Sequence, residues 1–423
     1  MSKQWIKNKA QLATSDARRM VLDIIEAGYE AIDTESVMKS AISLTDEVLT
    51  IKGQSFNLKD YHNTYVIGFG KAACTAAAVI DEILGNNISE GVAIGLSPIA
   101  CDFIKTYGGT HPHASEENVA LSKKILDLSS TLTEKDLVIV IVSGGGSALL
   151  CWPIEECKQA NKLYEDFLKT GGDILELNTV RKHISLLKGG GLAKHLYPAQ
   201  VIGLVFSDVP GHHNGVIASG PTFKDESTVK DAQKILDKYK LSGYVLNETP
   251  KEDKYFEKVV NIPLVSNIDA VSAMKAKAES LGLKTKILSE EIYDTPEETA
   301  QKFFESSEPG LVVLGAGEPK TIVTRKGGGT GGRCQRLGLE ALPLLEVDDV
   351  FAVFASDGLD NSQAAGVIED SQTQQLMIDK NLDYKAFEAT WDSLGFYSAL
   401  EDGLIMTGPT GANVSDLMVW YTK

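Results

Sequence analysis

Runs of aliphatic and β-branched residues end at loops rich in glycine or aspartate at five places along the chain. The runs are Tyr65–Ala73, Leu137–Leu149, Val201–Gly211, Gly310–Glu318 and Val350–Asp360. The hydrophobic part of each run has the length of a buried strand and lacks polar alternation, which is typical of parallel sheets covered on both faces. The pattern therefore predicts strands of an α/β fold, with ligand-binding loops at their carboxyl ends.

Amphipathic and alanine-rich segments alternate with these strands. We expect helices at 16–43, 71–84, 116–128, 229–239, 270–281 and 296–306, and further strands at 92–96, 263–266 and 284–288. The same alternation occurs in both halves of the chain, which indicates two α/β domains.

A charged and weakly apolar stretch at 225–258 separates the two halves. A chain of 423 residues is too long for one ordinary hydrophobic core. We therefore predict an N-terminal domain at 1–255 and a C-terminal domain at 256–423. Residues 1–45 are expected to be helical and could pack on the C-terminal domain.

The formal net charge of −17 changes the range of expected partners. An acidic surface repels nucleic acid and anionic membranes, so neither is expected to bind. A site for an anion must then carry local positive charge. Cationic side chains in or beside the glycine-rich segments could supply it: Lys71, Arg181, Lys182, Lys188, Arg325, Lys326 and Arg333.

The five cysteines form no C-x-x-C pair, and their odd number argues against a disulfide framework. The N-terminal segment lacks the apolar core of a signal peptide, and no apolar run approaches the length of a membrane span. These features predict a cytoplasmic protein.

The first loop, Gly68–Ala73, follows a strand and opens a helix. Its glycines allow a ligand to approach the backbone, and the start of a helix favours an anion. The loop fits neither G-x-G-x-x-G nor the Walker A pattern. Lys71 could bind a carboxylate or a transferring phosphoryl group, or it could be a solvated residue of a tight turn.

The second loop, Ser143–Ser147, follows the most hydrophobic strand. Its three glycines permit a nest of backbone N–H groups that binds an anion. A nucleophilic serine would require G-x-S-x-G, and the sequence has Leu149 at the last position. A close crossing of helix and sheet is the structural alternative.

Acidic residues and a third glycine-rich loop follow other strands. Asp208 could hold Mg²⁺ or accept a proton from a substrate hydroxyl, or it could cap a turn. Five glycines among the seven residues Gly327–Arg333 favour a ligand-binding loop, because glycine loses much backbone entropy when it is ordered. Asp357 and Asp360 could bind a metal or cap the following helix. Together the loops describe the charge neutralisation that phosphoryl transfer needs.

The chain resembles the class II glycerate kinases, or glycerate 2-kinases, a family with a C-terminal MOFRL domain whose members are also labelled hydroxypyruvate reductase. The matching segments run in the family's order and are GFGKAA at 68–73, SGGGSALL at 143–150, NTVRKHISLLKGGGLA at 178–193, SDVPG at 207–211, IASGPT at 217–222, GGR at 331–333, DG at 357–358, AAG at 364–366 and TGPTGANVSDL at 407–417.

The resemblance implies phosphorylation of D-glycerate to 2-phosphoglycerate with ATP and Mg²⁺. It implies a Rossmann-like N-terminal domain with a mostly parallel sheet, a mixed α/β C-terminal domain, and an active site in the cleft between them. The implied catalytic residues are Lys71, Asp208 and Arg333. The partners would be a small hydroxy acid and a nucleotide. Apart from the resemblance, the helical N-terminal segment could serve a homodimer.

The candidate binding residues fall on the same loops and on the basic segment at 178–193. For substrate and phosphate they are Gly70, Ser143, Gly144, Gly145, Gly146, Ser147, Arg181, Lys188, Gly331 and Gly332. For the metal they are Asp208 and Asp357.

The chain departs from the family pattern at His212, His213, Cys334 and Arg336, where acidic or amide residues are expected. These departures leave open an altered substrate, or a binding protein that has lost turnover. An NAD(P)H-dependent hydroxypyruvate reductase is disfavoured, because no strand is followed by G-x-G-x-x-G and a ribose-binding acid.

Overall fold

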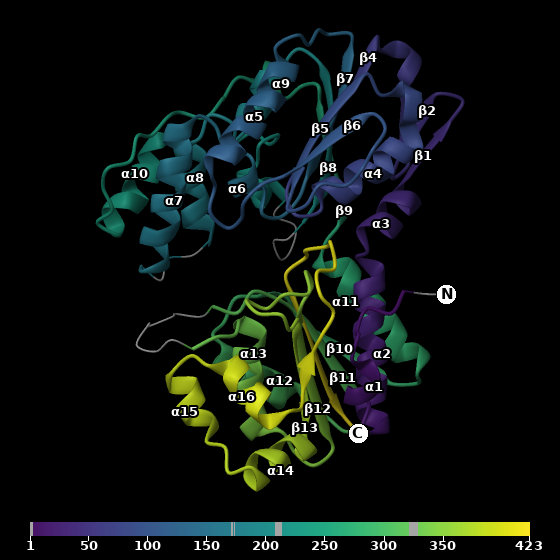
Figure 1. Cartoon of the computed structure of the whole chain (residues 1–423), viewed down its shortest axis with the longest axis vertical. Coiled ribbons are helices and arrows are strands. Elements are labelled where there is room, and N and C mark those ends of the chain that lie inside the picture. Colours follow the sequence, from purple (N-terminus) through teal and green to yellow (C-terminus); the bar gives the residue numbers. More distant parts are fainter. Residues whose placement is uncertain (1–2, 171, 173, 208–213, 321–328) are drawn as a thin grey trace. The chain divides into compact units, whose positions relative to one another are not determined.

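The computed structural model describes residues 3–170, 172, 174–207, 214–320 and 329–423. The chain divides into two compact units, each built around a six-stranded sheet (Figure 1). The parallel-sheet unit contains the described residues of 34–207 and 214–264, and the mixed-sheet unit contains those of 3–33 and 265–423. The N-terminal helices thus group with the C-terminal half. The domains predicted at 1–255 and 256–423 remain a proposal of which parts of the chain can fold independently.

The parallel-sheet unit has the strand order β6-β5-β4-β7-β8-β9. The pairs from β6 to β8 are all parallel, and every residue of the central strand β7 is buried. The predicted parallel arrangement is confirmed for this sheet. The strands are β4 (Asn63–Phe69), β5 (Glu90–Gly95), β6 (Ile104–Gly108), β7 (Asp136–Val142), β8 (Gln200–Phe206) and β9 (Val259–Val265).

Helices and a small meander surround this sheet. Helix α4 packs on β4, β5 and β6, while α7, α8 and α10 share a separate hydrophobic cluster to one side of the sheet (Figure 1). The helices are α3 (Thr34–Ala41), α4 (Ala73–Leu84), α5 (Glu116–Ser129), α6 (Gly146–Leu149), α7 (Ile154–Leu168), α8 (Ile174–Ile184), α9 (Gly191–Leu196) and α10 (Val229–Lys238), with 3₁₀ turns η1 (Leu58–Asp60), η2 (Gly85–Asn87), η3 (Asn214–Ser219) and η4 (Asp253–Tyr255). The antiparallel meander consists of β1 (Ile42–Thr45), β2 (Val48–Ile51) and β3 (Gln54–Asn57).

The mixed-sheet unit has the strand order β10-β11-β15-β12-β13-β14. Strand β15 is antiparallel to both β11 and β12, which therefore run in the same direction without pairing. The runs at 310–318 and 350–360 are strands as predicted, but they are not neighbours in a parallel sheet. The strands are β10 (Lys284–Ile292), β11 (Leu311–Gly317), β12 (Asp349–Ala355), β13 (Gly366–Asp370), β14 (Leu404–Ile405) and β15 (Asp416–Thr422).

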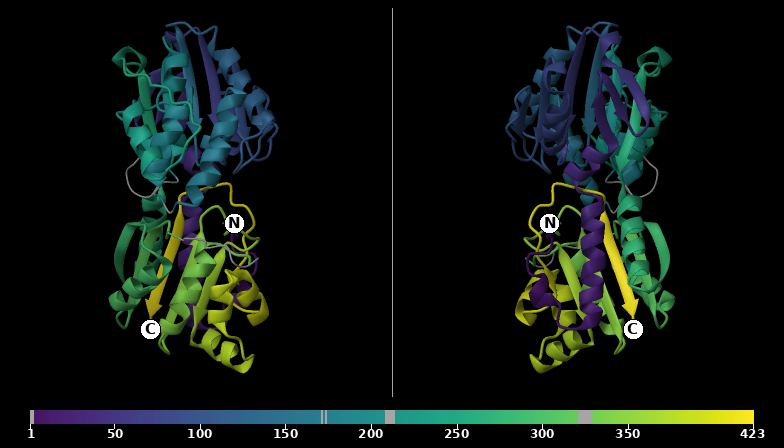
Figure 2. Two further views of the ribbon diagram at one scale, coloured as in Figure 1. Left: turned by 90° about the vertical axis from the view of Figure 1, so that its left-hand side faces the viewer. Right: turned by 90° about the vertical axis from the view of Figure 1, so that its right-hand side faces the viewer.

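Helices cover both faces of the mixed sheet. Helices α2 and α11 lie side by side on one face, where Gly28 allows Met274 to approach (Figure 2). Helices α12, α13 and α16 enclose the opposite core, in which the Phe351 ring lies 5.2 Å from that of Trp420. The helices are α1 (Lys9–Leu12), α2 (Asp16–Ala31), α11 (Asn267–Ser280), α12 (Pro296–Ser306), α13 (Arg333–Ala341), α14 (Ser371–Asp379), α15 (Tyr384–Ala389) and α16 (Ser393–Leu400), with the 3₁₀ turn η5 (Leu342–Leu344).

The predicted helix at 16–43 is wrong in its length. Helix α2 ends at Ala31, α3 begins at Thr34, and residues from Ile42 onward form β1. A short polar residue before a helix favours a new start, and Asp33 occupies that position before α3.

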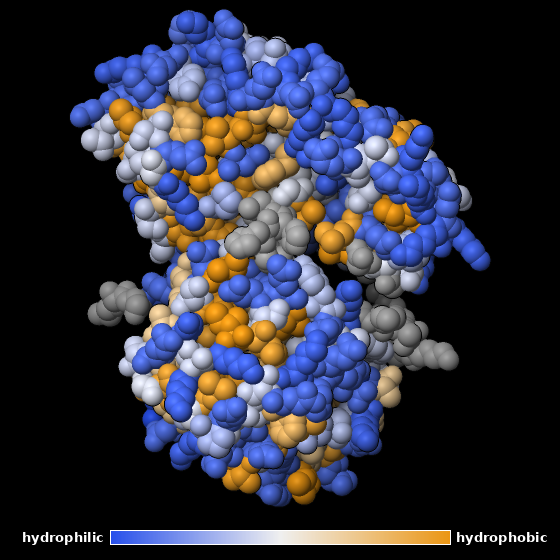
Figure 3. Space-filling view, turned by 180° about the vertical axis from the view of Figure 1, so that it is seen from behind, coloured by the Kyte–Doolittle hydropathy of each residue, from blue (hydrophilic) through white to orange (hydrophobic). Residues whose placement is uncertain are grey.

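Hydrophilic residues cover much of the visible surface of each unit, and hydrophobic residues gather in smaller groups (Figure 3). Within the described part of the chain, none of the helices combines the length and hydrophobicity needed to cross a bilayer.

Candidate active site

Two loops meet at the carboxyl ends of β4 and β7. The Lys71 N–H donates to the Gly144 carbonyl at 2.8 Å, and the Ala72 N–H donates to Ser143 Oγ at 3.1 Å. Gly70 has a φ of +122°, and a Cβ there would collide with Ser143. Glycine is required at this crossing because both its conformation and its surroundings exclude a side chain. The fold therefore brings Gly70, Lys71, Ser143 and Gly144 together.

Backbone donors remain available in the second loop. Among the described residues, the N–H groups of Gly144, Gly145 and Ser147 have no hydrogen-bond partner. Gly145 adopts a φ of +78°. Unpaired N–H groups in a glycine loop after a strand favour an oxyanion ligand.

His111 is a further side chain at this loop, and it was not singled out from the sequence. A Cβ on Gly145 would lie 3.1 Å from His111 Cδ2 and 3.2 Å from Lys71 Cγ, so the two side chains flank this glycine. His111 follows the edge strand β6, so the loops after β4, β6 and β7 contribute to one cluster. Its position after a strand of the same sheet is the signal that could have found it.

Ser147 is linked to helix α8 by a chain of side-chain hydrogen bonds. Its Oγ lies 2.9 Å from Ser219 Oγ, which in turn donates to Asn178 Oδ1 at 3.0 Å. Arg181, one turn further along α8, donates to the same oxygen at 3.4 Å. Two predicted residues, Ser147 and Arg181, are thus connected through Ser219 and Asn178, which the prediction did not include.

The segment that carries Ser219 has an unusual backbone. Ala218 and Ser219 have φ values of +49° and +61°, and Ser219 is fully buried. Left-handed conformations are uncommon for residues with a side chain and gather at functional sites. This segment belongs to the IASGPT motif, but its sequence did not reveal the backbone geometry.

Lys188 has a different environment from the one that its predicted role requires. Its Nζ lies 2.5 Å from Glu156 Oε1 and 2.9 Å from the Leu150 carbonyl, and both charged side chains are 2% exposed. Lys182 is paired in the same way with buried Asp225, at 3.0 Å. The geometry supports structural ion pairs for these lysines, so Lys188 is not part of the proposed site.

A second cluster lies in the mixed sheet, at the carboxyl ends of β11 and β12. Because β15 runs between β11 and β12, Asp416 at its start faces Gly317 and Ala355 at the ends of these strands. Arg333 begins α13 and donates to Asp416 Oδ2 at 3.1 Å and to Glu318 Oε2 at 3.0 Å. Two carboxylates from separate strand ends therefore neutralise this arginine.

Burial governs the electrostatics of this cluster. It raises the pKa of Asp416 to about 7, although Arg333 lowers it. Burial alone would lower the pKa of Arg333, but the charges of Asp416 and Glu318 outweigh it and raise that pKa. The arginine stays charged, and Asp416 can change its protonation state near neutral pH.

Asp360 acts as a cap for α13. Its carboxylate accepts from the N–H groups of Cys334 and Gln335 at 3.1 and 2.8 Å, which satisfies unpaired donors at the start of the helix. Of the two roles left open for this residue, the structure shows capping, although the capped helix precedes it in the sequence. Burial raises the pKa of Asp360 to about 6.

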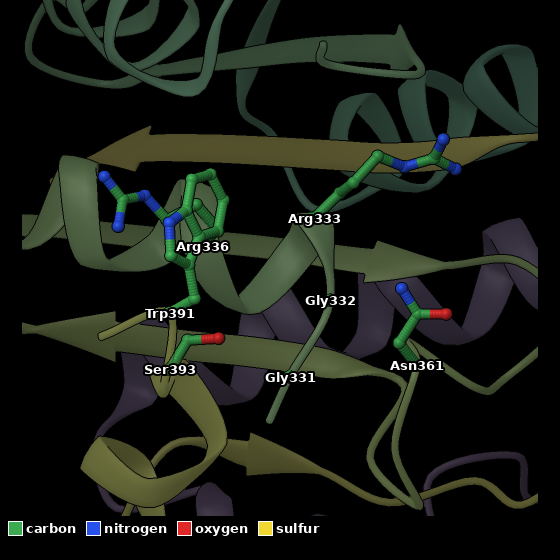
Figure 4. Close-up of a pocket in the computed structure, with 7 residues that line it drawn as sticks. All are labelled: Gly331, Gly332, Arg333, Arg336, Asn361, Trp391 and Ser393. Atoms are coloured by element: carbon green, nitrogen blue, oxygen red, sulfur yellow. The ribbon is translucent and has the colours of Figure 1, made fainter. Parts of the chain in front are cut away.

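A pocket adjoins this cap (Figure 4). Arg333 and Arg336 point in opposite directions from α13 in this view. The Arg336 guanidinium lies 5.0 Å from the centre of the Trp391 ring and 2.8 Å from Glu388 Oε1. It is also 2.6 Å from Glu340 Oε1, so the charge at this departure from the family pattern is compensated locally. The lining residues are Gly331, Gly332, Arg333, Arg336, Asn361, Trp391 and Ser393.

The remaining predicted residues are less informative. Asp208, His212 and His213 lie outside the described residues. Asp357 follows β12 and its Oδ1 accepts from the Leu359 N–H at 3.1 Å. In the described ranges, no three His, Cys, Asp or Glu side chains gather as a metal site. The metal role of Asp208 and Asp357 stays a prediction.

The predicted site residues thus fall into two clusters. Gly70, Lys71 and Ser143–Ser147 meet in the parallel-sheet unit, and Gly331–Arg333 lie in the mixed-sheet unit.

Comparison with known proteins gives the family. A domain of unknown function, DUF4147, matches residues 20–250, and the MOFRL family matches residues 311–416. The D-glycerate 2-kinase of Thermotoga maritima is 33% identical, over 95% of this chain and 97% of that protein. The chain belongs to the glycerate 2-kinase family. The human glycerate kinase is 30% identical, over 99% of this chain and 96% of its own length.

Solved structures agree with this membership. The crystal structure of Thermotoga maritima glycerate kinase has a TM-score of 0.80 and 29% identity, covering 96% of this chain and 99% of that chain. A Pyrococcus horikoshii protein has a TM-score of 0.76 and 30% identity, covering 97% and 100%. The predicted family, the α/β fold class and the phosphotransferase class of this glycerate 2-kinase family member are therefore confirmed.

Proposed function

We propose that this glycerate 2-kinase family member transfers a phosphoryl group from ATP to D-glycerate, giving 2-phosphoglycerate and ADP, or to a hydroxyl of a closely related hydroxy acid. The observation that carries the proposal is the joined pair of loops at β4 and β7. It places Lys71 beside three backbone N–H groups that have no partner among the described residues. Relatives named glycerate kinase support the substrate class.

The chemistry of this loop pair suits phosphoryl transfer, which depends on positioning and on neutralising charge. Lys71 and the N–H groups of Gly144 and Gly145 would bind the acid or the transferring group. In this proposal Asp208 accepts the proton of the substrate hydroxyl. Arg333 would bind a carboxylate or phosphate, at the cost of its contacts with its own acidic neighbours.

The residues also fit the two groups that the family implies. Backbone donors in a glycine loop suit a nucleotide phosphate. Mg²⁺ in such sites needs only one or two protein carboxylates, because phosphate and water complete its coordination. Asp208 and Asp357 would hold it, and the ion would supply charge neutralisation at the phosphates.

A coupled assay of ADP release with a panel of sugar acids tests the proposal. We expect release with D-glycerate and a 2-phosphoglycerate signal in ³¹P NMR. Lys71→Met should lower turnover about tenfold to over a hundredfold, because a charge-assisted contact of about 1.5–3 kcal/mol is lost in the transition state. Lys123→Met, on the exposed face of α5, is the matched control and should retain activity.

Folded protein that releases no ADP with any acid would refute the proposed function. Oxidation of NADH with hydroxypyruvate would instead favour a reductase. Sedimentation would test the proposed homodimer. The proposed cytoplasmic location agrees with cysteines that are free of disulfides.

A further inference from the structure

The hydrogen bonds between α6 and α8 have a defined direction. Asn178 Oδ1 lies within hydrogen-bond distance of both Ser219 Oγ and Arg181 Nη1. A guanidinium can only donate, so the atom that Arg181 faces must be the amide oxygen and not the amide nitrogen. Arg181 therefore fixes the orientation of the Asn178 side chain.

That orientation determines the proton of Ser219. Its hydroxyl is 3.0 Å from an oxygen that has no proton to give, so Ser219 must donate to Asn178. If it donated elsewhere, two acceptor oxygens would face each other in a buried site, which is costly. Ser219 is fully buried, so water cannot supply a replacement.

The proton of Ser147 is determined in turn. Its Oγ lies 2.9 Å from Ser219 Oγ, whose own proton is engaged. Ser147 must therefore donate to Ser219, and it keeps only lone pairs for a further partner. Ser147 follows directly on Gly144–Gly146 and is half-buried.

We propose that the Ser147 hydroxyl is a hydrogen-bond acceptor that recognises a hydroxyl of the substrate, and that this side chain does not bind a phosphate or carboxylate oxygen. The inference rests on the proposed function, because it takes the second loop as the site of the hydroxy acid. Lys71 and the loop N–H groups then bind the anionic end, while Ser147 selects ligands with a donor at its position. Ser219, Asn178 and Arg181 are positioning residues that set this polarity.

Calorimetry without nucleotide tests the inference. The ligands are D-glycerate, D-lactate, which lacks the 3-hydroxyl, 3-hydroxypropanoate, which lacks the 2-hydroxyl, and inorganic phosphate. Wild-type protein should bind D-glycerate about three- to tenfold more tightly than one of the two deoxy acids. Ser147→Ala should remove that preference and leave the affinity for phosphate unchanged. Ser129→Ala, which removes a buried hydroxyl elsewhere in the same unit, should preserve it.

Ser219→Ala provides a second test with the opposite sign. Without Ser219 the Ser147 proton can turn towards a ligand, so the affinity for phosphate should rise about three- to tenfold. Adding Ser147→Ala should abolish this gain. Weaker phosphate binding by Ser147→Ala would show that Ser147 donates to the anion, and would overturn the inference. Wild-type protein that binds none of the acids would overturn it as well.

These results are separable from the proposed function. If D-glycerate is turned over but its preference over the deoxy acids persists in Ser147→Ala, only the inference is refuted. If the preference depends on Ser147 but the protein releases no ADP, only the kinase proposal is refuted.

Discussion

Replacing Arg333 by Met should change how the stability of the mixed-sheet unit depends on pH. The substitution removes the cation that contacts Asp416 at 3.1 Å and Glu318 at 3.0 Å. Asp416 is 4% exposed, so its carboxylate would lie in the protein interior without a compensating charge. Such a group takes up a proton in preference to remaining ionised.

The magnitude follows from proton linkage. In the wild type the folded-state pKa of Asp416 is raised from 3.8 to about 7. A raised carboxyl pKa means that the folded state holds a proton that the unfolded state has lost. The free energy of unfolding therefore falls as pH rises between these values and levels off above them. Without Arg333 the pKa moves higher, so the fall continues, at about 1.4 kcal/mol per pH unit.

Urea unfolding at a series of pH values would measure this effect. Between pH 7 and 8.5 the free energy of unfolding of the Arg333→Met variant should fall by about 2 kcal/mol, and that of wild type by only about 0.4 kcal/mol. Tryptophan fluorescence suits the measurement, because Trp5, Trp391 and Trp420 belong to the mixed-sheet unit. Adding Asp416→Asn removes the group that titrates, and the double variant should regain the wild-type slope.

Parallel curves for wild type and Arg333→Met over this pH range would refute the reasoning. They would mean that Asp416 does not depend on Arg333 for its charge. A slope that persists in the double variant would assign the titration to another group, with Glu318 as the nearest candidate.

Two further predictions concern Gly145, which has a matched control at Gly243, and Arg336 on α13. Gly145→Ala should lower the free energy of unfolding by about 1–2 kcal/mol, because alanine is strained at a φ of +78°. It should also lower ADP release, because the new methyl group displaces the side chains of His111 and Lys71. Gly243→Ala has a similar φ of +81° with nothing within 4 Å of the added atom, so it should destabilise without loss of activity; equal activity of the two variants would contradict the proposed site. Arg336→Glu, which restores the acidic residue of the family pattern, should destabilise the fold by about 3 kcal/mol, because it places a carboxylate beside Glu340 in a buried site. A melting midpoint lowered by roughly 10 °C is expected, and an unchanged one would refute the compensation described for this arginine.

Capping residues and hydrophobic runs in the sequence predicted the helices and strands whose limits depend on neighbouring residues. The helix at 296–306 was predicted with its observed limits, because Thr295 caps it, Glu298 completes the capping box, and proline occupies the first turn. The buried strands β7 and β12 were recognisable from their continuous hydrophobic runs.

Elements that depend on tertiary pairing were missed. The meander at 42–57 has turns at Asp46–Glu47 and Lys52–Gly53, and all four residues have positive φ values. The pair Asp46–Glu47 contains no glycine or asparagine and is therefore not a strong turn sequence. Strand β15 is hydrophobic, but no local pattern states that it enters between β11 and β12.

The candidate site shows the same division. Glycine-rich composition identified the loops that hold Lys71, Ser147 and Arg333. The partners of these residues are distant in the sequence: Ser219 is 72 residues from Ser147, and Asp416 is 83 residues from Arg333. Single-sequence patterns do not specify such contacts, so neutralisation of Arg333 and the polarity of Ser147 became visible only in the fold.

The position of β15 has a consequence for synthesis on the ribosome. Residues 416–422 form an interior strand of the mixed sheet, between β11 and β12. Until this segment leaves the exit tunnel, the flanking strands expose unpaired edges that can associate with other chains. All strands of the parallel sheet, β4 to β9, emerge much earlier and can assemble during translation. Nascent chains stalled before residue 416 should therefore require chaperone protection for one half of the molecule and not for the other.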